Sequence, residues 1–223
     1  YLSPYKTSGV NLCPMAEKAG CIDACLYYAG RGKFENVKAA RLARTKLYLT
    51  NQAAYFNQLI KEIVALEKRA AKLGLKPLVR LNGTSDIRWE NIHFVYNNVT
   101  YRNIFELFPN IQFMDYTKIP NRINSMNGIS KFPANYDLTF SYSGKPGFEK
   151  YNQRAIDKGM RIAAVFDKVE SIPLTFHKRQ VLSGDDNDLT FTKPKNSILA
   201  LYAKGFKKEI QLGLNSQFII RGA

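Results

Sequence analysis

Long hydrophobic runs are absent from this 223-residue sequence. No stretch of about 18 or more apolar residues occurs, which excludes a membrane-spanning helix. Residues 1–13 contain no apolar signal core followed by a cleavage site, so we expect a cytoplasmic protein rather than a secreted one. No Gly-x-Gly-x-x-Gly motif follows any apolar run, which argues against a dinucleotide-binding fold.

Acidic residues are in short supply. The chain has 18 Asp and Glu against 33 Lys and Arg, which gives a net charge of +15. A surplus of this size favours a polyanionic partner, because each phosphate that binds a basic side chain releases condensed counterions. A basic, solvated surface without any partner is the alternative. We therefore expect a nucleic acid or a nucleotide as partner or substrate, and no membrane.

What the sequence does contain is an alternation of short apolar runs with helical stretches. The runs typical of buried strands are residues 77–83, 111–118, 136–144, 161–167 and 197–205. A further strand is expected upstream or near 180–183. The helical stretches cover roughly residues 25–49, 51–73, 101–108 and 148–158. The alternation predicts a single α/β domain over residues 1–223, with parallel β/α repeats that form a partial TIM-type barrel. A complete barrel and an open doubly wound sheet are the alternatives.

Polar side chains follow the predicted strands at their carboxyl ends. In each of these architectures, ligands bind at this edge of the sheet. The residues there are Asn82, Gly83, Thr84, Ser85 and Asp86, then Asp115, Tyr116, Thr117 and Lys118, then Ser141, Tyr142 and Ser143, and finally Asp167 and Lys204. Loops are often polar, but five polar strand ends in succession predict a shared binding site.

All three cysteines, Cys13, Cys21 and Cys25, lie in the segment CPMAEKAGCIDAC with Cys-x7-Cys-x3-Cys spacing. Buried structural cysteines scatter through a core, and one disulfide would leave a thiol over. Soft thiolates select iron–sulfur clusters, and three of them on a four-iron cluster leave one iron open to a ligand. We predict that this loop, about residues 10–32, binds a 4Fe-4S cluster.

Zinc is the main alternative to that cluster. It could bind the three thiolates together with His93, His177 or Asp23 as a fourth ligand. Neither histidine has an acid or a nucleophile nearby in sequence, so we expect both to be structural or exposed. Trp89 is expected to be a core residue.

Four segments, CPMAEKAGCIDACLYYAGRG, RLNGTSDIRWE, MDYTKIPNR and LYAKG, together resemble the phage-encoded gene product 88 family. The likeness runs through residues 13–205. It implies a viral or prophage origin, and hence the cytoplasm of a host cell. The family resemblance by itself implies little about mechanism.

The cysteine loop and the β/α pattern resemble, more loosely, radical S-adenosylmethionine (SAM) enzymes, whose usual spacing is Cys-x3-Cys-x2-Cys. That resemblance implies a radical-SAM-like partial barrel in which the open iron chelates SAM and an external electron donor reduces the cluster. By strand order it also implies a SAM-binding set, namely Asn82, Thr84, Ser85, Asp86, Ser141 and Ser143. Lys118 would meet the SAM carboxylate or an anionic substrate, and Lys118 and Asp115 are the candidate catalytic residues.

The leading functional prediction is therefore an enzyme that cleaves SAM to make a radical and modifies a nucleotide or nucleic acid. One alternative is a basic nucleic-acid-binding protein with a structural iron–sulfur or zinc site. Another is a metal-dependent nuclease that uses Asp86, Asp115 and the acidic residues of 185–188. The same acidic segment is otherwise expected to be a turn, since Ser, Gly, Asp and Asn favour turns.

Overall fold

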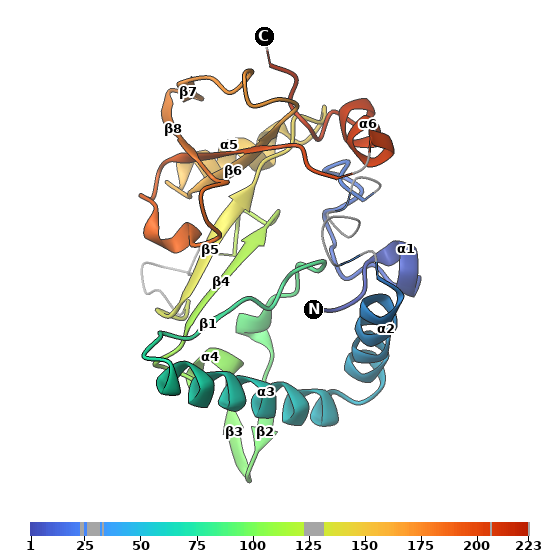
Figure 1. Cartoon of the computed structure of the whole chain (residues 1–223), viewed down its shortest axis with the longest axis vertical. Coiled ribbons are helices and arrows are strands. Elements are labelled where there is room, and N and C mark those ends of the chain that lie inside the picture. The colour runs from blue at the N-terminus through green and yellow to red at the C-terminus, as the bar shows by residue number, and fades with distance from the viewer. Residues whose placement is uncertain (23–24, 26–31, 33, 123–131, 206, 223) are drawn as a thin grey trace.

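The computed structural model describes residues 1–22, 25, 32, 34–122, 132–205 and 207–222. These residues form a mixed α/β fold around a seven-stranded sheet of order β1-β4-β5-β6-β9-β8-β7 (Figure 1). The strands are β1 (Leu78–Val79), β4 (Gln112–Thr117), β5 (Tyr136–Ser141), β6 (Ile162–Phe166), β7 (Thr175–Phe176), β8 (Arg179–Ser183) and β9 (Ile198–Tyr202). Every neighbouring pair from β1 to β8 is parallel, and only the β7–β8 pair is antiparallel.

The predicted parallel α/β sheet is confirmed, but it does not close into a barrel. In the described part of the chain, β1 and β7 are the two edges of the sheet. The β7–β8 hairpin turns back on itself instead of continuing the parallel series, and β1 has only two paired residues. The described residues therefore include no strand that joins the two edges.

The predicted strands agree well with those observed, and residues 180–183 belong to β8. The long helices are α2 (Glu35–Thr50) and α3 (Gln52–Lys72), and a shorter one, α5 (Glu149–Asp157), lies between β5 and β6. Asn51 caps α3, because its side chain accepts a hydrogen bond from the Ala54 N–H. Residues 26–31 of the predicted helix 25–49 lie outside the described residues.

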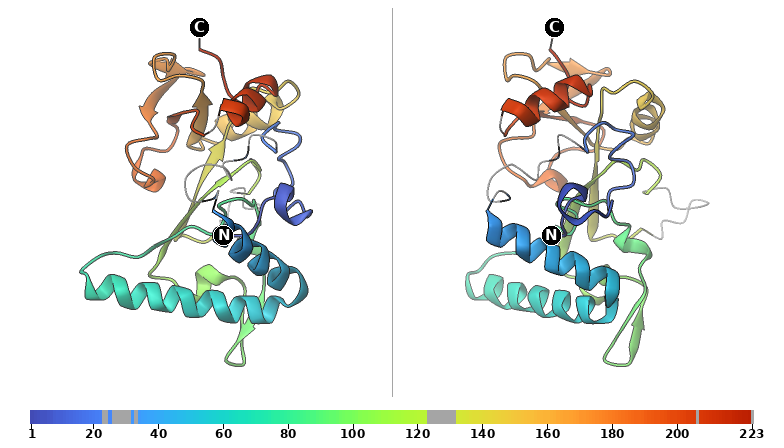
Figure 2. Two further views of the ribbon diagram at one scale, coloured as in Figure 1. Left: turned by 45° about the vertical axis from the view of Figure 1, so that its right-hand side comes forward. Right: turned by 90° about the vertical axis from the view of Figure 1, so that its right-hand side faces the viewer.

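The prediction of a helix over residues 101–108 is wrong at its start. Tyr101 ends a small hairpin formed by β2 (Phe94–Tyr96) and β3 (Val99–Tyr101), and α4 (Ile104–Leu107) begins only after the Asn103 cap. The sequence analysis also missed α1 (Tyr5–Ser8) and α6 (Lys207–Asn215). Figure 2 shows α2 and α3 side by side at the end of the molecule opposite α6. Among the described residues, no helix has the length and apolar character needed to cross a bilayer.

The core lies between the sheet and the helices of one face. Phe113 and Leu138 pack with the buried α4 residue Phe105, and Trp89 is 1 % exposed, as expected for a core residue. Farther along the sheet, Ile162 and other alternate strand residues pack with Phe148 at the start of α5. Strands β1, β4, β5 and β6 follow chain order, so right-handed crossovers put their connections on this face. The opposite face of the sheet is therefore free of these connections.

Candidate functional site

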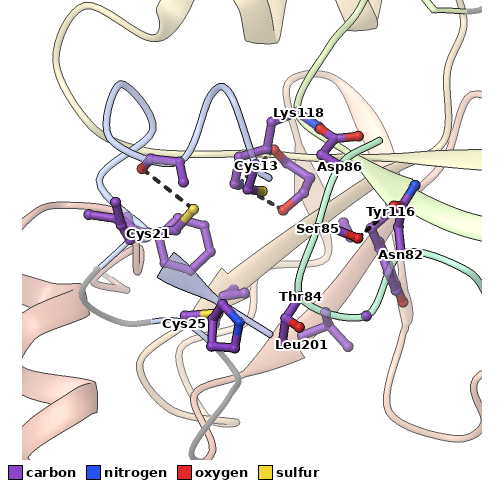
Figure 3. A pocket seen from close by; sticks show the side chains of 18 of the residues that line it. Cys13, Cys21, Cys25, Asn82, Thr84, Ser85, Asp86, Tyr116, Lys118 and Leu201 are labelled. Atoms are coloured by element: carbon purple, nitrogen blue, oxygen red, sulfur yellow. Dashed lines mark hydrogen bonds between the residues drawn. The ribbon is translucent and has the colours of Figure 1, made fainter. Parts of the chain in front are cut away.

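A cavity of about 330 Å³ lies on that opposite face, at the carboxyl ends of the strands (Figure 3). Its floor is formed by alternate strand residues, namely Tyr116 of β4, Ser141 of β5, Ala163 and Val165 of β6, and Leu201 of β9. Arg80, just after β1, lines it too. Because β1 and β9 are four steps apart in the sheet, an open sheet that reaches one cavity from both must curve around it. Several of the polar strand ends that were predicted to share a site therefore line one cavity.

The cysteine segment forms a wall of this cavity. Cys13, Cys21 and Cys25 all line it. The segment is bound to the strand ends through its backbone, since the Asp86 N–H donates to the Leu12 carbonyl over 2.8 Å. This contact brings the start of the cysteine segment to the carboxyl edge of the sheet.

The loop after β5 supplies the second set of contacts to the cysteine segment. Ser143 Oγ donates to the Ala19 carbonyl over 2.7 Å, and Lys145 Nζ donates to the Glu17 carbonyl over 3.0 Å. Gly20 lies at this crossing with a φ of +70°. This left-handed backbone conformation favours a glycine between the two segments.

The thiols are buried in this wall. Burial raises the pKa of the Cys13 thiol, and the Asp86 carboxylate raises it further. Burial also raises the pKa of the Cys21 thiol, while Lys118 opposes that shift. Within the described ranges, no three His, Cys, Asp or Glu side chains are grouped closely enough to hold one metal ion. The three thiols thus line one cavity, but the described residues do not form a closed metal site.

The proposed fourth ligands of a zinc site are not at the cavity. His93 and His177 do not line it, and His177 Nε2 lies 3.1 Å from the Tyr142 hydroxyl. Asp23 lies outside the described residues.

Lys118 is a buried cation at the cavity, with 6 % of its surface exposed. Its Nζ donates to the carbonyl and the hydroxyl of Ser141 over 3.2 and 2.9 Å, and lies 4.5 Å from the ring centroid of Phe218. No carboxylate in the described part of the chain forms an ion pair with it. A buried ammonium without a counter-ion is costly, so this position favours an anionic ligand in the cavity.

Asp86 also reaches the cavity, but its carboxylate is occupied. It accepts hydrogen bonds from the Lys118 N–H over 2.8 Å, from Thr117 Oγ1 over 3.1 Å and from Arg122 over 2.7 Å. Arg122 in turn donates to both carboxylate oxygens of Glu90 over 2.9 and 2.6 Å. Burial raises the pKa of Asp86, and Arg122 opposes the shift. Arg122 and Glu90 were not predicted as site residues. The available signal was the pair of acids, Asp86 and Glu90, that lie four residues apart on either side of a buried tryptophan.

Asn82 organises the loop after β1 from within. Its Oδ1 accepts hydrogen bonds from Ser85 Oγ, the Ile87 N–H and the Trp89 indole N–H over 2.8, 3.0 and 3.0 Å. Its Nδ2 donates to the Ile87 carbonyl. Thr84 Oγ1 donates to the Leu2 carbonyl. Asn82, Thr84 and Ser85 line the cavity as predicted, but these bonds commit their side chains to shaping the loop.

The family model described as Gene product 88 matches residues 1–222. The chain belongs to the gene product 88 family. No curated protein and no solved structure matches it. The match confirms the family resemblance of the sequence, whereas the looser likeness to radical SAM enzymes has no support from these comparisons.

Two predicted site residues of this gene product 88 protein lie away from the cavity. Asp115 is on the helix-covered face of β4, where its oxygens accept hydrogen bonds from the Asn82 N–H and the Tyr136 hydroxyl, both over 2.8 Å. Ser143 is fully buried and bonds the cysteine segment. Neither is among the lining residues. A period of two along a strand places Asp115 and its neighbour Tyr116 on opposite faces.

The far wall of the cavity contains charged residues that were not predicted from the sequence to lie together. Asp185 pairs with Lys204 and accepts the Tyr202 N–H over 3.0 Å. Asp188 lines the same wall, while Asp186 points elsewhere and pairs with Lys193 over 3.3 Å. The acidic segment therefore divides between the cavity and the surface, and does not form the cluster that the nuclease alternative needs.

Proposed function

We propose that this protein is a radical-SAM-like enzyme. It holds an iron–sulfur cluster on Cys13, Cys21 and Cys25, binds SAM beside it, and modifies a nucleotide or nucleic-acid substrate. The observation that carries the proposal is the cavity itself, where three thiols and the unpaired Lys118 ammonium meet at the carboxyl edge of a parallel sheet.

Three cysteine thiols are the kind of donor that such a cluster takes. The bonds that hold the cysteine segment use its backbone carbonyls, at Leu12, Glu17 and Ala19, and leave the segment's thiols on the cavity side. Thiols with raised pKa values release their protons when a metal binds, so loading and deprotonation are coupled. A cluster held by Cys13, Cys21 and Cys25 would supply the electron for cleaving the sulfonium carbon–sulfur bond of SAM, and an external donor would have to reduce it.

The protein's own residues bind and orient the cofactor. Lys118 offers its ammonium to the SAM carboxylate, and Ser141 fixes the direction of that ammonium through two hydrogen bonds. Asp115 and Ser143, which do not line the cavity, are positioning residues in this proposal. Asp115 supports the loop after β1, and Ser143 supports the cysteine segment.

The curved, open sheet supports the relationship to a partial barrel. Its first four parallel strands follow chain order and carry the cavity on the face opposite the crossover segments. A partial barrel has the same order and places its ligands at the same strand ends. Neither feature depends on the spacing of the cysteines.

Anaerobic purification followed by iron and sulfide analysis tests the cluster. We expect brown protein with broad absorption near ~400 nm and about four irons per chain. Cys21→Ser is expected to lose the colour. Colourless protein with one bound zinc would refute the cluster and favour a nucleic-acid-binding protein with a structural metal.

SAM binding is tested separately on the reduced protein by EPR. The cluster signal is expected to change on addition of SAM in the unsubstituted protein and to stay unchanged in Lys118→Met, which retains its iron. Lys72→Met, an exposed lysine in the last turn of α3, is the matched control and should respond like the unsubstituted protein. A signal that ignores SAM in every sample would show that no SAM reaches the cluster.

A further inference from the structure

Two charged side chains at the cavity, Arg80 and Glu209, have no role in the proposed function. Arg80 Nε and Glu209 Oε2 are buried, and neither atom has a hydrogen-bond partner within the part of the chain that the structure describes. Both residues line the cavity, and neither forms an ion pair with the other or with another described residue. Buried polar atoms are nearly always paired, so unpaired ones in two charged side chains that line a cavity point to a ligand there.

Arg80 is fixed in place by an aromatic ring. Its guanidinium carbon lies 4.9 Å from the ring centroid of Tyr116, the β4 residue on the cavity floor. Stacking orients the guanidinium plane while leaving its N–H groups available for bonding at the edge. Of the two acids on the far wall, Asp185 is paired with Lys204 and Asp188 is exposed to solvent, so neither forms an ion pair with Arg80.

The cavity therefore contains two separate cations without ion-pair partners, Lys118 and Arg80. Lys118 lies beside Cys13, which places it on the cysteine side of the cavity (Figure 3). SAM carries one carboxylate, and Lys118 accounts for it. The second cation requires an anion from the other ligand, the substrate.

We infer that Arg80 binds the phosphate of a nucleotide substrate, and that Glu209 accepts a hydrogen bond from a hydroxyl or amino group of the same nucleotide. The inference rests on the proposed function, since it assigns the substrate of that site. A guanidinium fork matches the geometry of two phosphate oxygens, and the net charge of +15 favours phosphate over an isolated carboxylate. A carboxylate at the other end of the ligand repels phosphate and so sets the orientation.

The phosphate could belong to a free nucleotide or to a strand of nucleic acid. Calorimetry on anaerobically purified protein distinguishes these sources with three sets of probes: the four 2′-deoxynucleoside 5′-monophosphates, the matching nucleosides, and a single-stranded 12-mer. We expect at least one monophosphate, or the 12-mer alone if the substrate is a strand, to bind about tenfold or more tightly than the best nucleoside. Equal affinity for phosphorylated and unphosphorylated probes would overturn the inference.

Variants of the two residues give the sharper result. For Arg80→Gln, we expect phosphorylated and unphosphorylated probes to bind with nearly equal affinity. Glu209→Met is expected to weaken both affinities about tenfold and to leave their ratio unchanged. Arg69→Gln and Glu67→Gln, on the exposed part of α3, are matched controls and should change neither value. If Arg80→Gln does not fold, Arg80→Lys keeps the charge and is expected to retain part of the ratio. An unchanged ratio in the folded Arg80 variant refutes the inference.

The two proposals fail in different ways. Colourless protein whose phosphate preference still depends on Arg80 would refute the radical-SAM proposal and leave the phosphate site standing. Brown protein that responds to SAM, but whose nucleotide binding ignores Arg80, would refute the phosphate site alone.

Discussion

Asp115 provides a prediction that separates a structural from a catalytic role. Its carboxylate is 1 % exposed and accepts hydrogen bonds from the Asn82 N–H and the Tyr136 hydroxyl. Burial raises its pKa from 3.8 to about 7, and the two hydrogen bonds only partly oppose that shift. The perturbation is Asp115→Asn, which keeps the shape and an acceptor oxygen but cannot ionise.

The sign of the effect follows from the raised pKa. Between about pH 4 and pH 7 the folded protein holds a proton on Asp115 that the unfolded chain has released. The stability that this group contributes is therefore fully present below about pH 4 and is lost as the pH rises through 7. A shift of about three pKa units, at about 1.4 kcal/mol each, corresponds to about 4 kcal/mol.

Urea denaturation of both proteins at a series of pH values measures this. We expect the free energy of unfolding of the unsubstituted protein to fall, relative to that of Asp115→Asn, by about 4 kcal/mol from pH 4 to pH 8. Other titrating groups, including Asp86, are common to both proteins and cancel in the difference. Parallel curves would refute the buried, protonated carboxyl. SAM or nucleotide binding at pH 6 should be the same in both proteins, and its loss in a folded variant would restore a functional role for Asp115.

Three further substitutions test the network around the site. Arg122→Met leaves two buried carboxylates unpaired. We expect the free energy of unfolding, measured by urea denaturation, to fall by about 3–5 kcal/mol, and a fall below about 1 kcal/mol would contradict the buried ion pairs. Asn82→Ala leaves the Trp89 indole N–H and a backbone N–H without acceptors, and the free energy of unfolding should fall by about 2–4 kcal/mol in the same measurement. A change close to zero would show that solvent reaches these groups. Ser143→Ala should cost only about 1 kcal/mol but lower the iron content of anaerobically purified protein, whereas full iron loading would show that this bond does not position the cysteines.

The strands were predictable because burial on both faces leaves a strong signal. Residues 111–118 and 161–167 are short and dense in apolar residues, and β4 and β6 lie within them. The alternation with helices then predicted a parallel sheet and the edge at which ligands gather. The cavity at that edge follows from topology, and needs no recognition of any single motif.

Side-chain direction at the site was less predictable, since it depends on register rather than on composition. Tyr116 and Asp115 are adjacent polar residues at the end of β4, yet one lines the cavity and the other accepts bonds on the opposite face. A run that is buried on both faces gives no alternation by which to tell the faces apart. The open edges of the sheet were equally hard to predict, because the β7–β8 hairpin and the two-residue β1 leave little trace in the hydrophobic pattern.

The way the cysteine segment is held argues for a site that depends on the sheet. Its contacts come from the loop after β1, through Asp86, and from the loop after β5, through Ser143. Lys118 directly follows β4 and is held from both sides, because its N–H donates to Asp86 and its ammonium donates to Ser141 of β5. The thiols and the cation are thus set by the same three strand ends. A change at one strand end must therefore alter the thiols and the cation together, which is the behaviour expected of one binding site.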